Sequence, residues 1–391
     1  MRTTEQLLAA PEISGPELDE AKELAVSLIE AKLAEFTDYF PDSNSRDQFY
    51  PQTDNVEWTT GFWTGQIWLA YEITGKECFK KAGTIQAESF LQRILNRRDV
   101  DHHDMGFLYS PSCVAAWQLT GDETARQAAL LAADNLMERF HEKGHFFQAW
   151  GTIGAADNYR LIIDCLLNMP LLFWAAGETG KEIYREKAIA HITTAMQLLI
   201  RPDCSTYHTY FFDPETGLPV RGVTHQGNRD GSAWSRGQAW GIYGAAMAYR
   251  YVRNEEYVAI FEKVTAFFLE HLPSDLIPYW DFDFDDGSSE PRDSSAAAIA
   301  ACGMLEMAKY LPAEKAGYYK QMAGRLMHAL WQRCAVRDQA VSNGLLLHGT
   351  YARDSVNNPC SNRGVDECNT WGDYYYLEGL VRLSADWKPY W

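Results

Sequence analysis

The sequence predicts an all-α fold, an (α/α)6 barrel of six inner and six outer helices. Three observations predict it: helical periodicity through almost all of the 391 residues, an alternation of apolar and amphipathic helices, and a recurring Thr-Gly stop between them. Single cores usually stop growing at about 250–300 residues, but a closed ring of helices lengthens without thickening its core. We therefore predict one domain over residues 1–391.

The helices follow one another in pairs. Apolar helices are predicted to begin near residues 60, 107, 160, 235, 294 and 372, and amphipathic partners near 17, 77, 124, 181, 255 and 314. The Thr-Gly stops at 74–75, 120–121 and 179–180 each place Gly where a helix favours a left-handed C-cap. The acidic residue that follows suits the start of the next helix.

An open solenoid of helix pairs is the alternative to a closed ring. A solenoid needs polar capping helices at both ends, yet the last apolar helix, near residue 372, is as aromatic as the middle ones. We therefore favour the ring. In a ring, the long segments 141–158, 202–233, 274–292 and 335–370 are predicted to gather at one rim and build a site.

Charge and composition exclude several partners. With 35 Lys and Arg against 53 Asp and Glu, the net charge is −18, which argues against nucleic acid and anionic membranes. No apolar run reaches about 18 residues, and no leader is recognised after Met1. Eight scattered cysteines without a C-x-x-C pair favour reduced thiols and a cytoplasmic location. The oligomeric state cannot be inferred from these features.

Asp164 lies in an apolar segment predicted to be an inner helix beginning near 160. A carboxylate with apolar neighbours needs a partner or takes a raised pKa, and both are typical of a general acid. The alternative is a structural ion pair with Arg160 one helical turn earlier, with Asn168 one turn later on the same face. The sequence leaves both interpretations open.

Two acidic segments imitate metal sites. Asp101-His-His-Asp104 precedes an inner helix, but adjacent side chains diverge and no second His or Cys cluster follows. Residues 281–287 imitate a calcium loop, but the required Gly comes one place late and Arg292 replaces the terminal Glu. We predict no metal and no cofactor. Asp104 is either an N-capping residue beside half-buried imidazoles or a carboxylate at the barrel mouth.

The segment 235–240 predicts an anion site. Ser235 and Gln238 form a capping-box pattern, which places Arg236 in the first helical turn. A cation there lies at the positive end of the helix dipole, which is unfavourable. An anionic ligand bound at this helix start would explain why an arginine is present. Trp240, one turn later, is predicted to stack on a flat or ring-shaped substrate. The alternative for Arg236 is a solvent-exposed salt bridge with an acidic residue such as Asp230.

The segment 335–370 holds a candidate sulfate contact. Ser361 and Arg363 alternate along it, so that in an extended strand both side chains point to one side. A hydroxyl and a guanidinium that point to one side can form a charge-assisted contact to sulfate. The alternative is a solvated loop in which Arg363 binds nothing.

Several of these segments together resemble the unsaturated glucuronyl hydrolases of glycoside hydrolase family 88. The resemblance covers nearly the whole chain and is carried by residues 54–65, 101–109, 148–151, 161–168, 234–243 and 371–376. It implies a six-fold α/α barrel that needs no cofactor. It also implies removal of a 4,5-unsaturated uronic acid from the non-reducing end of lyase products, such as chondroitin or hyaluronan disaccharides, by hydration of the C4=C5 bond.

The resemblance also implies residue roles. Asp104 and Asp164 are the two catalytic carboxylates, with Asp164 as general acid/base and Asp104 bonding the ring hydroxyls and tuning Asp164. The implied sugar-binding residues are Trp58, Phe62, His103, Trp150, His208, Gly222, Thr224, Gln226, Arg236, Trp240 and Tyr351. Two alternatives remain: a related barrel hydrolase acting on unsaturated rhamnogalacturonides, and a non-catalytic helical-repeat protein that binds glycans.

Overall fold

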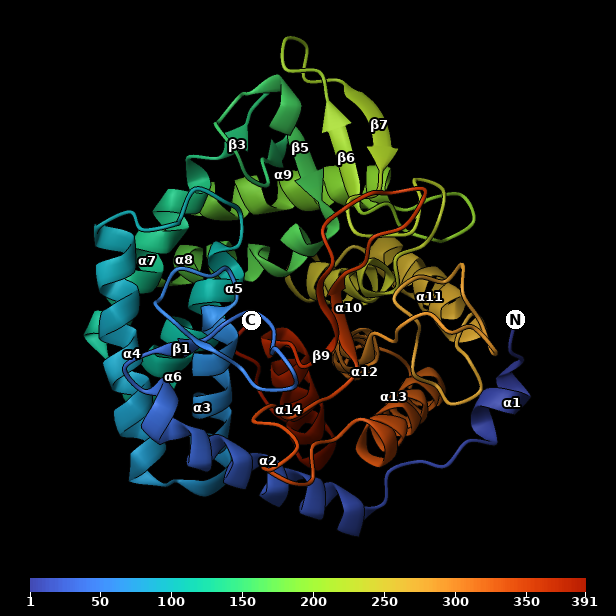
Figure 1. Cartoon of the computed structure of the whole chain (residues 1–391). Helices are drawn as coiled ribbons and strands as arrows, with labels where there is room; N and C mark the ends of the chain where they lie inside the picture. Colours follow the sequence, from blue (N-terminus) through green and yellow to red (C-terminus); the bar gives the residue numbers. More distant parts are fainter.

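The computed structural model describes all of residues 1–391 and forms a ring of paired helices (Figure 1). The outer helices are α2 (Gly15–Phe36), α4 (Glu77–Leu95), α7 (Glu123–Met137), α9 (Glu182–Leu199), α11 (Glu255–Glu270) and α13 (Ala313–Arg333). The inner helices are α3 (Thr60–Thr74), α5 (Met105–Tyr109) with α6 (Ala115–Thr120), α8 (Met169–Thr179), α10 (Ser235–Val252), α12 (Ser294–Met307) and α14 (Thr370–Ser384). A short helix, α1 (Thr4–Leu8), precedes them. The predicted (α/α)6 barrel is confirmed.

Two inner helices depart from the regular pattern. A π-helical stretch, Ser110–Val114, joins α5 to α6, and it contains Pro111, whose missing N–H weakens α-helical bonding. The helix predicted from residue 160 begins instead at Met169, with Pro170 in its first turn, where the fixed backbone angle of proline suits a helix start.

The ring is closed between its first and last inner helices. Helix α14 packs against both α12 and α3. The Gln66 side chain on α3 donates to the Thr370 carbonyl at 3.4 Å, and Asn44 pairs with Asn369 in an isolated bridge. An open solenoid has no such contacts between its two ends.

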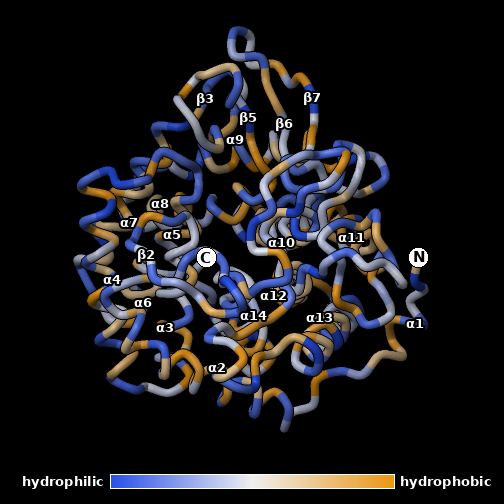
Figure 2. The backbone as a smooth tube through the Cα atoms, in the orientation of Figure 1, coloured by the Kyte–Doolittle hydropathy of each residue, from blue (hydrophilic) through white to orange (hydrophobic).

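Close approach of the inner helices depends on two glycines. A Cβ added at Gly61 would lie 2.2 Å from the Phe107 carbonyl oxygen, and one at Gly106 would lie 2.3 Å from the Asn168 Cα. Every residue of α12 is buried, whereas outer helices bury one face, and Figure 2 shows hydrophobic and hydrophilic residues alternating along α2 and α4. The core therefore lies mainly between and inside the inner helices.

A buried ionic network joins three inner helices. Arg382 on α14 bonds Glu378 at 2.8 Å, Glu306 on α12 at 2.7 Å and the Tyr243 hydroxyl on α10 at 2.6 Å. Trp391 adds to it, because its Nε1 donates to Glu378 at 2.7 Å. Each buried charge has a partner of opposite sign, so breaking one pair would leave the other charge uncompensated.

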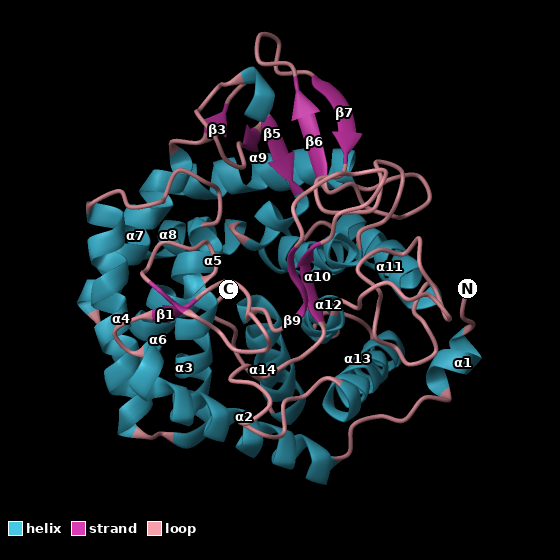
Figure 3. Cartoon of the chain, in the orientation of Figure 1, coloured by secondary structure: helices cyan, strands magenta, loops and turns pink.

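Short antiparallel strands occupy the connections (Figure 3). They are β1 (Phe40–Pro41) with β2 (Gln52–Thr53), β3 (Phe140–His141) with β4 (Phe146–Phe147), and β8 (Gly349–Ala352) with β9 (Arg363–Glu367). A three-stranded sheet has the order β5 (Arg160–Ile162), β6 (Thr209–Phe212) and β7 (Pro219–Val223), with Leu161 opposite Tyr210. No helix has the length and apolar character needed to cross a membrane, and none of the eight cysteines forms a disulfide.

Candidate active site

A cavity of about 470 Å³ opens among the connections of the ring. Such a volume suits a small ligand. Its wall comprises Trp58, His103, Asp104, Trp150, Asp164, His225, Gln226, Trp234, Arg236, Trp240, Tyr351, Ala352, Asn358, Pro359, Cys360, Ser361 and Arg363. Three of the four long segments predicted to build a site contribute to this wall, and the segment 274–292 does not.

Asp164 lies in a turn of 3₁₀-helix, Ile163–Leu167, and not in the predicted α-helix. The preceding residues are drawn into β5 by pairing with β6, so the chain turns sharply into α8 just after Asp164. The alternative interpretation, an ion pair with Arg160, is therefore wrong: Arg160 donates to Asn158 at 2.9 Å and lies 4.3 Å from the Trp150 ring. The Asp164 side chain is 16% exposed, toward the cavity.

His103 lies between two carboxylates. Its Nε2 is 3.3 Å from Asp104 Oδ1 and 3.5 Å from Asp164 Oδ1. Asp104 occupies the N-cap position of α5 but makes no capping hydrogen bond, and its other oxygen lies 3.0 Å from His102 Nδ1. Of the two interpretations of Asp104, the structure favours the carboxylate at the barrel mouth.

Burial and neighbouring charges shift the pKa values of the two carboxylates in opposite directions. Burial, reinforced by the charge of Asp104, raises the pKa of Asp164 well above its usual range, and Arg236 only partly opposes this. Burial also acts to raise the pKa of Asp104, but His103 and the hydrogen bond from His102 outweigh it and leave that pKa lowered. The pair therefore holds a proton on Asp164 and a negative charge on Asp104.

The same cluster has the dimensions of a metal site. His103, Asp104 and Asp164 each offer a ligand atom, and these atoms lie within 4.8 Å of one another. Metal ligation needs a deprotonated carboxylate, and the raised pKa of Asp164 opposes it. Burial lowers the pKa of His103 to about 4, so its ring is neutral at pH 7. Asp101 is not part of this cluster, because it pairs with Arg97 at 3.3 Å.

Arg236 lies in the first turn of α10, as predicted, but without the predicted capping box. The N-cap residue is Trp234 and makes no side-chain cap. The Ser235 hydroxyl is buried without a hydrogen bond, and the Gln238 amide donates instead to the Val264 and Cys204 carbonyls, each at 2.9 Å. The start of α10 is therefore determined by tertiary packing and not by local capping.

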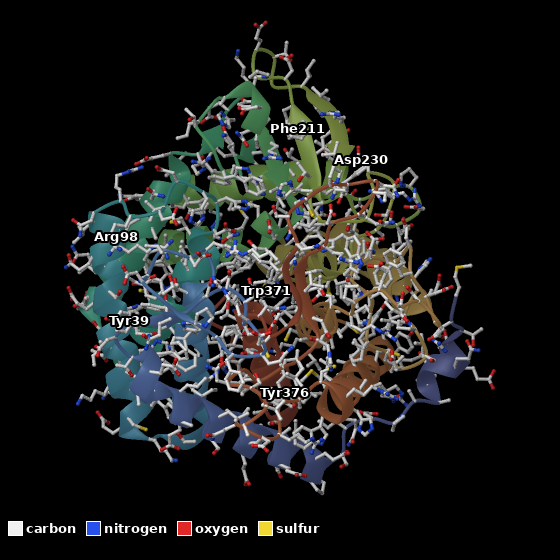
Figure 4. All side chains as sticks on the ribbon, viewed as in Figure 1. Tyr39, Arg98, Phe211, Asp230, Trp371 and Tyr376 are labelled. Carbon is white, nitrogen blue, oxygen red and sulfur yellow. The ribbon has the colours of Figure 1, made fainter.

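The Arg236 guanidinium is 2% exposed and fully bonded along one edge. It pairs with Asp293, and not with Asp230, and it donates to the Thr350 and Tyr351 carbonyls at 2.6 Å each. The Trp234 and Trp371 rings lie 4.5 and 5.0 Å from it. Figure 4 shows Trp371 toward the centre of the ring of helices and Asp230 farther out. The alternative interpretation, a solvent-exposed salt bridge with Asp230, is therefore wrong.

Aromatic side chains form one wall of the cavity. Trp58 stacks on Trp371 with ring centroids 5.3 Å apart, and its Nε1 donates to the Tyr351 hydroxyl at 2.8 Å. Trp240 packs against Phe107 at 5.3 Å. Broad aromatic faces beside a few convergent polar groups suit a sugar ring, whose C–H faces are apolar and whose rim is polar.

Most of the predicted binding residues line the cavity, but Phe62, His208, Gly222 and Thr224 lie behind its wall. Phe62 packs under Phe107 at 5.2 Å. His208 lies 3.1 Å from Gln226 Oε1, and the Thr224 hydroxyl accepts from the Gly227 amide at 2.7 Å. Gly222 packs against the Tyr207 ring, where a Cβ would lie at 2.6 Å. These residues hold the wall in place.

Six wall residues were not predicted from the sequence: His225, Trp234, Ala352, Asn358, Pro359 and Cys360. His225 and Trp234 adjoin predicted residues and could have been found by proximity in the chain. Asn358 is brought in by a contact between distant segments, because its amide donates to the Gly227 and His225 carbonyls at 2.8 and 3.2 Å.

Ser361 and Arg363 both reach the cavity wall. Arg363 begins β9 and is not a free cation: it donates to the Ser43 hydroxyl at 2.7 Å and to Glu57 at 3.1 Å, with Asp42 at 3.7 Å. The interpretation of Arg363 as a solvated side chain without partners is therefore wrong. Any anion that binds Arg363 must compete with two carboxylates.

Comparisons with known proteins agree on one family. Residues 30–379 match the family described as Glycosyl Hydrolase Family 88. The unsaturated chondroitin disaccharide hydrolase of Streptococcus pneumoniae is 46% identical over 394 residues, which is 100% of this chain and 98% of that protein.

Solved structures show the same similarity. The crystal structure of unsaturated glucuronyl hydrolase from Streptococcus agalactiae superposes with a TM-score of 0.95 at 45% identity, covering 99% of this chain and 96% of that one. An Asp→Asn variant of that enzyme, complexed with dGlcA-GalNAc6S, matches with a TM-score of 0.87 at 42% identity, over 99% and 96% of the two chains. This chain, too, therefore belongs to Glycosyl Hydrolase Family 88, and it is a glycoside hydrolase.

Proposed function

We propose that this enzyme removes the 4,5-unsaturated uronic acid from the non-reducing end of lyase-generated oligosaccharides, with chondroitin- and hyaluronan-type disaccharides as its substrates. One observation carries the proposal: Asp164, with its pKa raised by burial and by Asp104, faces a cavity beside ionised Asp104. The names of the relatives, unsaturated chondroitin disaccharide hydrolase and unsaturated glucuronyl hydrolase, support the substrate class.

The reaction is a hydration of the C4=C5 double bond. Asp164 donates its proton to C4, and a water molecule adds at C5 while giving a proton back to the Asp164 carboxylate. The hemiketal formed at C5 carries the ring oxygen and the new hydroxyl, and it opens spontaneously. Opening turns C5 into a ketone and leaves a hemiacetal at C1, which collapses to an aldehyde as its hydroxyl proton passes to the glycosidic oxygen and the remaining sugar departs. One water is consumed overall.

The spacing of the carboxylates argues against an inverting arrangement. Inverting glycosidases separate their two carboxyl groups by about 6.5–9.5 Å to admit water between them. Here one oxygen of Asp104 and one of Asp164 lie within 4.8 Å of each other, with His103 Nε2 beside both. This spacing is too short for the inverting arrangement, and the raised pKa of Asp164 beside ionised Asp104 supports Asp164 as the one residue that cycles the proton, while Asp104 accepts hydrogen bonds from ring hydroxyls.

Binding of an anionic sugar requires local positive charge, because the chain carries −18 overall. Arg236 supplies that charge at the wall, and Trp58 and Trp240 offer aromatic faces for the ring. We assign the uronate carboxylate to the Arg236 side of the cavity. The leaving sugar then extends toward Ser361 and Arg363.

The proposal predicts loss of the ultraviolet absorbance of the C4=C5 bond when unsaturated chondroitin or hyaluronan disaccharides are added. Hydration removes the double bond that conjugates with the carboxylate, so the absorbance decay follows turnover directly. A panel of disaccharides from different lyases, with a saturated glucuronide as control, measures it. Activity on the saturated glucuronide alone would contradict the hydration mechanism.

Sulfated substrates test the outer part of the cavity. We expect Arg363→Ala to lower kcat/KM for a 6-sulfated unsaturated disaccharide about tenfold and to leave the unsulfated one nearly unchanged, since a hydrogen bond to a charged group contributes about 1.5–3 kcal/mol. Arg46→Ala is the matched control, because Arg46 pairs with the same Asp42 at 3.2 Å but does not line the cavity. Equal losses on both substrates would assign Arg363 a structural role.

The proposal also covers the domain organisation of the chain and its location in the cell. Residues 1–391 act as one catalytic domain, supported by the family match over 30–379 and by the contact between α3 and α14. The enzyme works in the cytoplasm on small oligosaccharides, with no metal, cofactor, nucleic acid or membrane as partner. The reduced cysteines and the charge of −18 support this setting.

A further inference from the structure

Asp293 is a fully buried carboxylate that the mechanism above does not use. It lies directly before α12, with none of its surface exposed, and it accepts a hydrogen bond from Arg236 Nη1. It does not line the cavity. An aspartate without solvent contact needs a reason to be charged, and Arg236 provides it.

The position of Asp293 is fixed from its other side. Its Oδ1 accepts from the Ser295 hydroxyl at 2.5 Å, and that hydroxyl in turn accepts from Trp371 Nε1 at 3.0 Å. Trp371 also stacks on Trp58 of the cavity wall. The carboxylate is thus held by α12 and α14 and cannot follow Arg236 if the guanidinium moves toward the cavity.

Arg236 has two effects in the cavity that conflict. Its charge attracts an anionic substrate, but the same charge lowers the pKa of Asp164 and so favours loss of the catalytic proton. Charges act strongly on each other where water is excluded. A counter-ion on the far side of the guanidinium reduces the field at Asp164 while leaving Nε and one Nη2 hydrogen, which bond no protein group, available as donors.

We propose that Asp293 is a positioning residue for the reaction: it balances the charge of Arg236, so that Arg236 can bind an anionic substrate without drawing the proton from Asp164. The proposal rests on the assignment of Asp164 as proton donor. The titratable and charged groups that face Asp164 are Arg236 on α10, Asp104 and His103 before α5, Cys165 beside it, and Tyr375 on α14. Of these groups only Arg236 bonds Asp293, so removing the Asp293 charge changes only how far the positive charge of Arg236 is compensated.

The test compares Asp293→Asn with the wild-type enzyme over a pH series, using an unsaturated chondroitin disaccharide. We expect the alkaline limb of kcat to move about one unit to lower pH, so that kcat above that limb falls about tenfold. KM should not rise, because Arg236 without the opposing charge of Asp293 attracts an anionic substrate at least as strongly. An unchanged pH profile with only a lower melting temperature would overturn the proposal, as would a raised KM with unchanged kcat.

A measurement without substrate separates this proposal from the proposed function. Infrared difference spectroscopy of the free enzyme follows the C=O band of a protonated carboxyl, assigned to Asp164 by its loss in Asp164→Asn. In Asp293→Asn the band should disappear at a lower pH than in the wild type, whatever sugar the enzyme cleaves. A band with unchanged titration overturns the role of Asp293, whereas failure of the proposed function appears as absence of wild-type turnover.

Two further variants keep the test decisive if Asp293→Asn folds poorly. Asp293→Glu keeps the charge and should keep the wild-type alkaline limb even if the protein is less stable. In an Arg236→Gln background, adding Asp293→Asn should change nothing further, because Asp293 acts through Arg236. A limb shifted by Asp293→Glu, or a further shift in the double variant, would contradict the proposal.

Asp373→Asn is the matched control. Asp373 is equally buried, and its charge acts on a buried cation, Lys32, away from the cavity wall. Its loss should lower the melting temperature but leave the pH profile and the infrared titration of Asp164 at their wild-type positions. A shift of the same size in this control would show that any lost buried charge has the effect, and the proposal would fail.

Discussion

Replacing Asp164 by asparagine should reduce kcat by about 10²–10⁴-fold, because the amide keeps the shape of the side chain but cannot donate and recover a proton. The melting temperature should not fall, since the burial that raises the pKa of Asp164 disfavours its charged form and the amide carries no charge. Substrate affinity should stay close to wild type. Absorbance kinetics, calorimetry and equilibrium titration with substrate measure the three quantities.

Asp157→Asn is the control for this substitution. Asp157 is exposed on the connection just before β5, so the same chemical change is made seven residues away from Asp164, outside the cavity wall. It should leave kcat unchanged. If Asp164→Asn retained turnover within a few-fold of the wild type, Asp164 would have a structural role and the proton would have to come from another group.

The second large effect is expected for Asp104→Asn. The charge of Asp104 raises the pKa of Asp164, so its removal lowers that pKa and Asp164 loses its proton at a lower pH. We therefore expect the alkaline limb of the kcat profile to move to lower pH. The acid limb should disappear, because the group with the lowered pKa no longer titrates. The loss of hydrogen bonding to the ring hydroxyls adds a fall in kcat of about 10²-fold.

A pH series of kcat and kcat/KM measures both limbs. Asp101→Asn serves as control, since Asp101 lies three residues earlier, is exposed and pairs with Arg97. Its profile should match the wild type. An alkaline limb that stays in place or moves to higher pH in Asp104→Asn would mean that the two carboxylates do not interact as described.

Sequence periodicity predicted the helices because their stability depends on which face is buried. Eleven of twelve predicted helix starts fall within two residues of the observed ones, including α4 at Glu77 and α11 at Glu255. The failure, near residue 160, has a clear cause. Residues Arg160–Ile162 pair with β6, about 50 residues later, and an apolar run of that length fits a strand as well as a helix.

The signals that could have corrected the prediction were present in the chain. Ile162 and Ile163 are β-branched and favour extended backbone, and Pro170 favours a helix start one or two residues earlier. The partner of Arg236 was harder to predict from the sequence. Asp293 lies 57 residues away in the chain, whereas Asp230 is near in sequence but bonds the Thr224 amide. Pairing between distant segments depends on the closed ring, which local patterns do not describe.

The contact between α3 and α14 has a consequence for biosynthesis. The ring stays open until residues 370–384 have left the ribosome, so contacts between residues about 300 positions apart form last. Until then, the aromatic residues of the inner helices have no complete partner surface, and long-range contacts of this kind slow folding and expose apolar surface to aggregation. A nascent chain that stalls before α14 would therefore present Trp58, Phe62 and Gln66 at an open edge, which makes the final helix the segment on which the yield of folded enzyme depends.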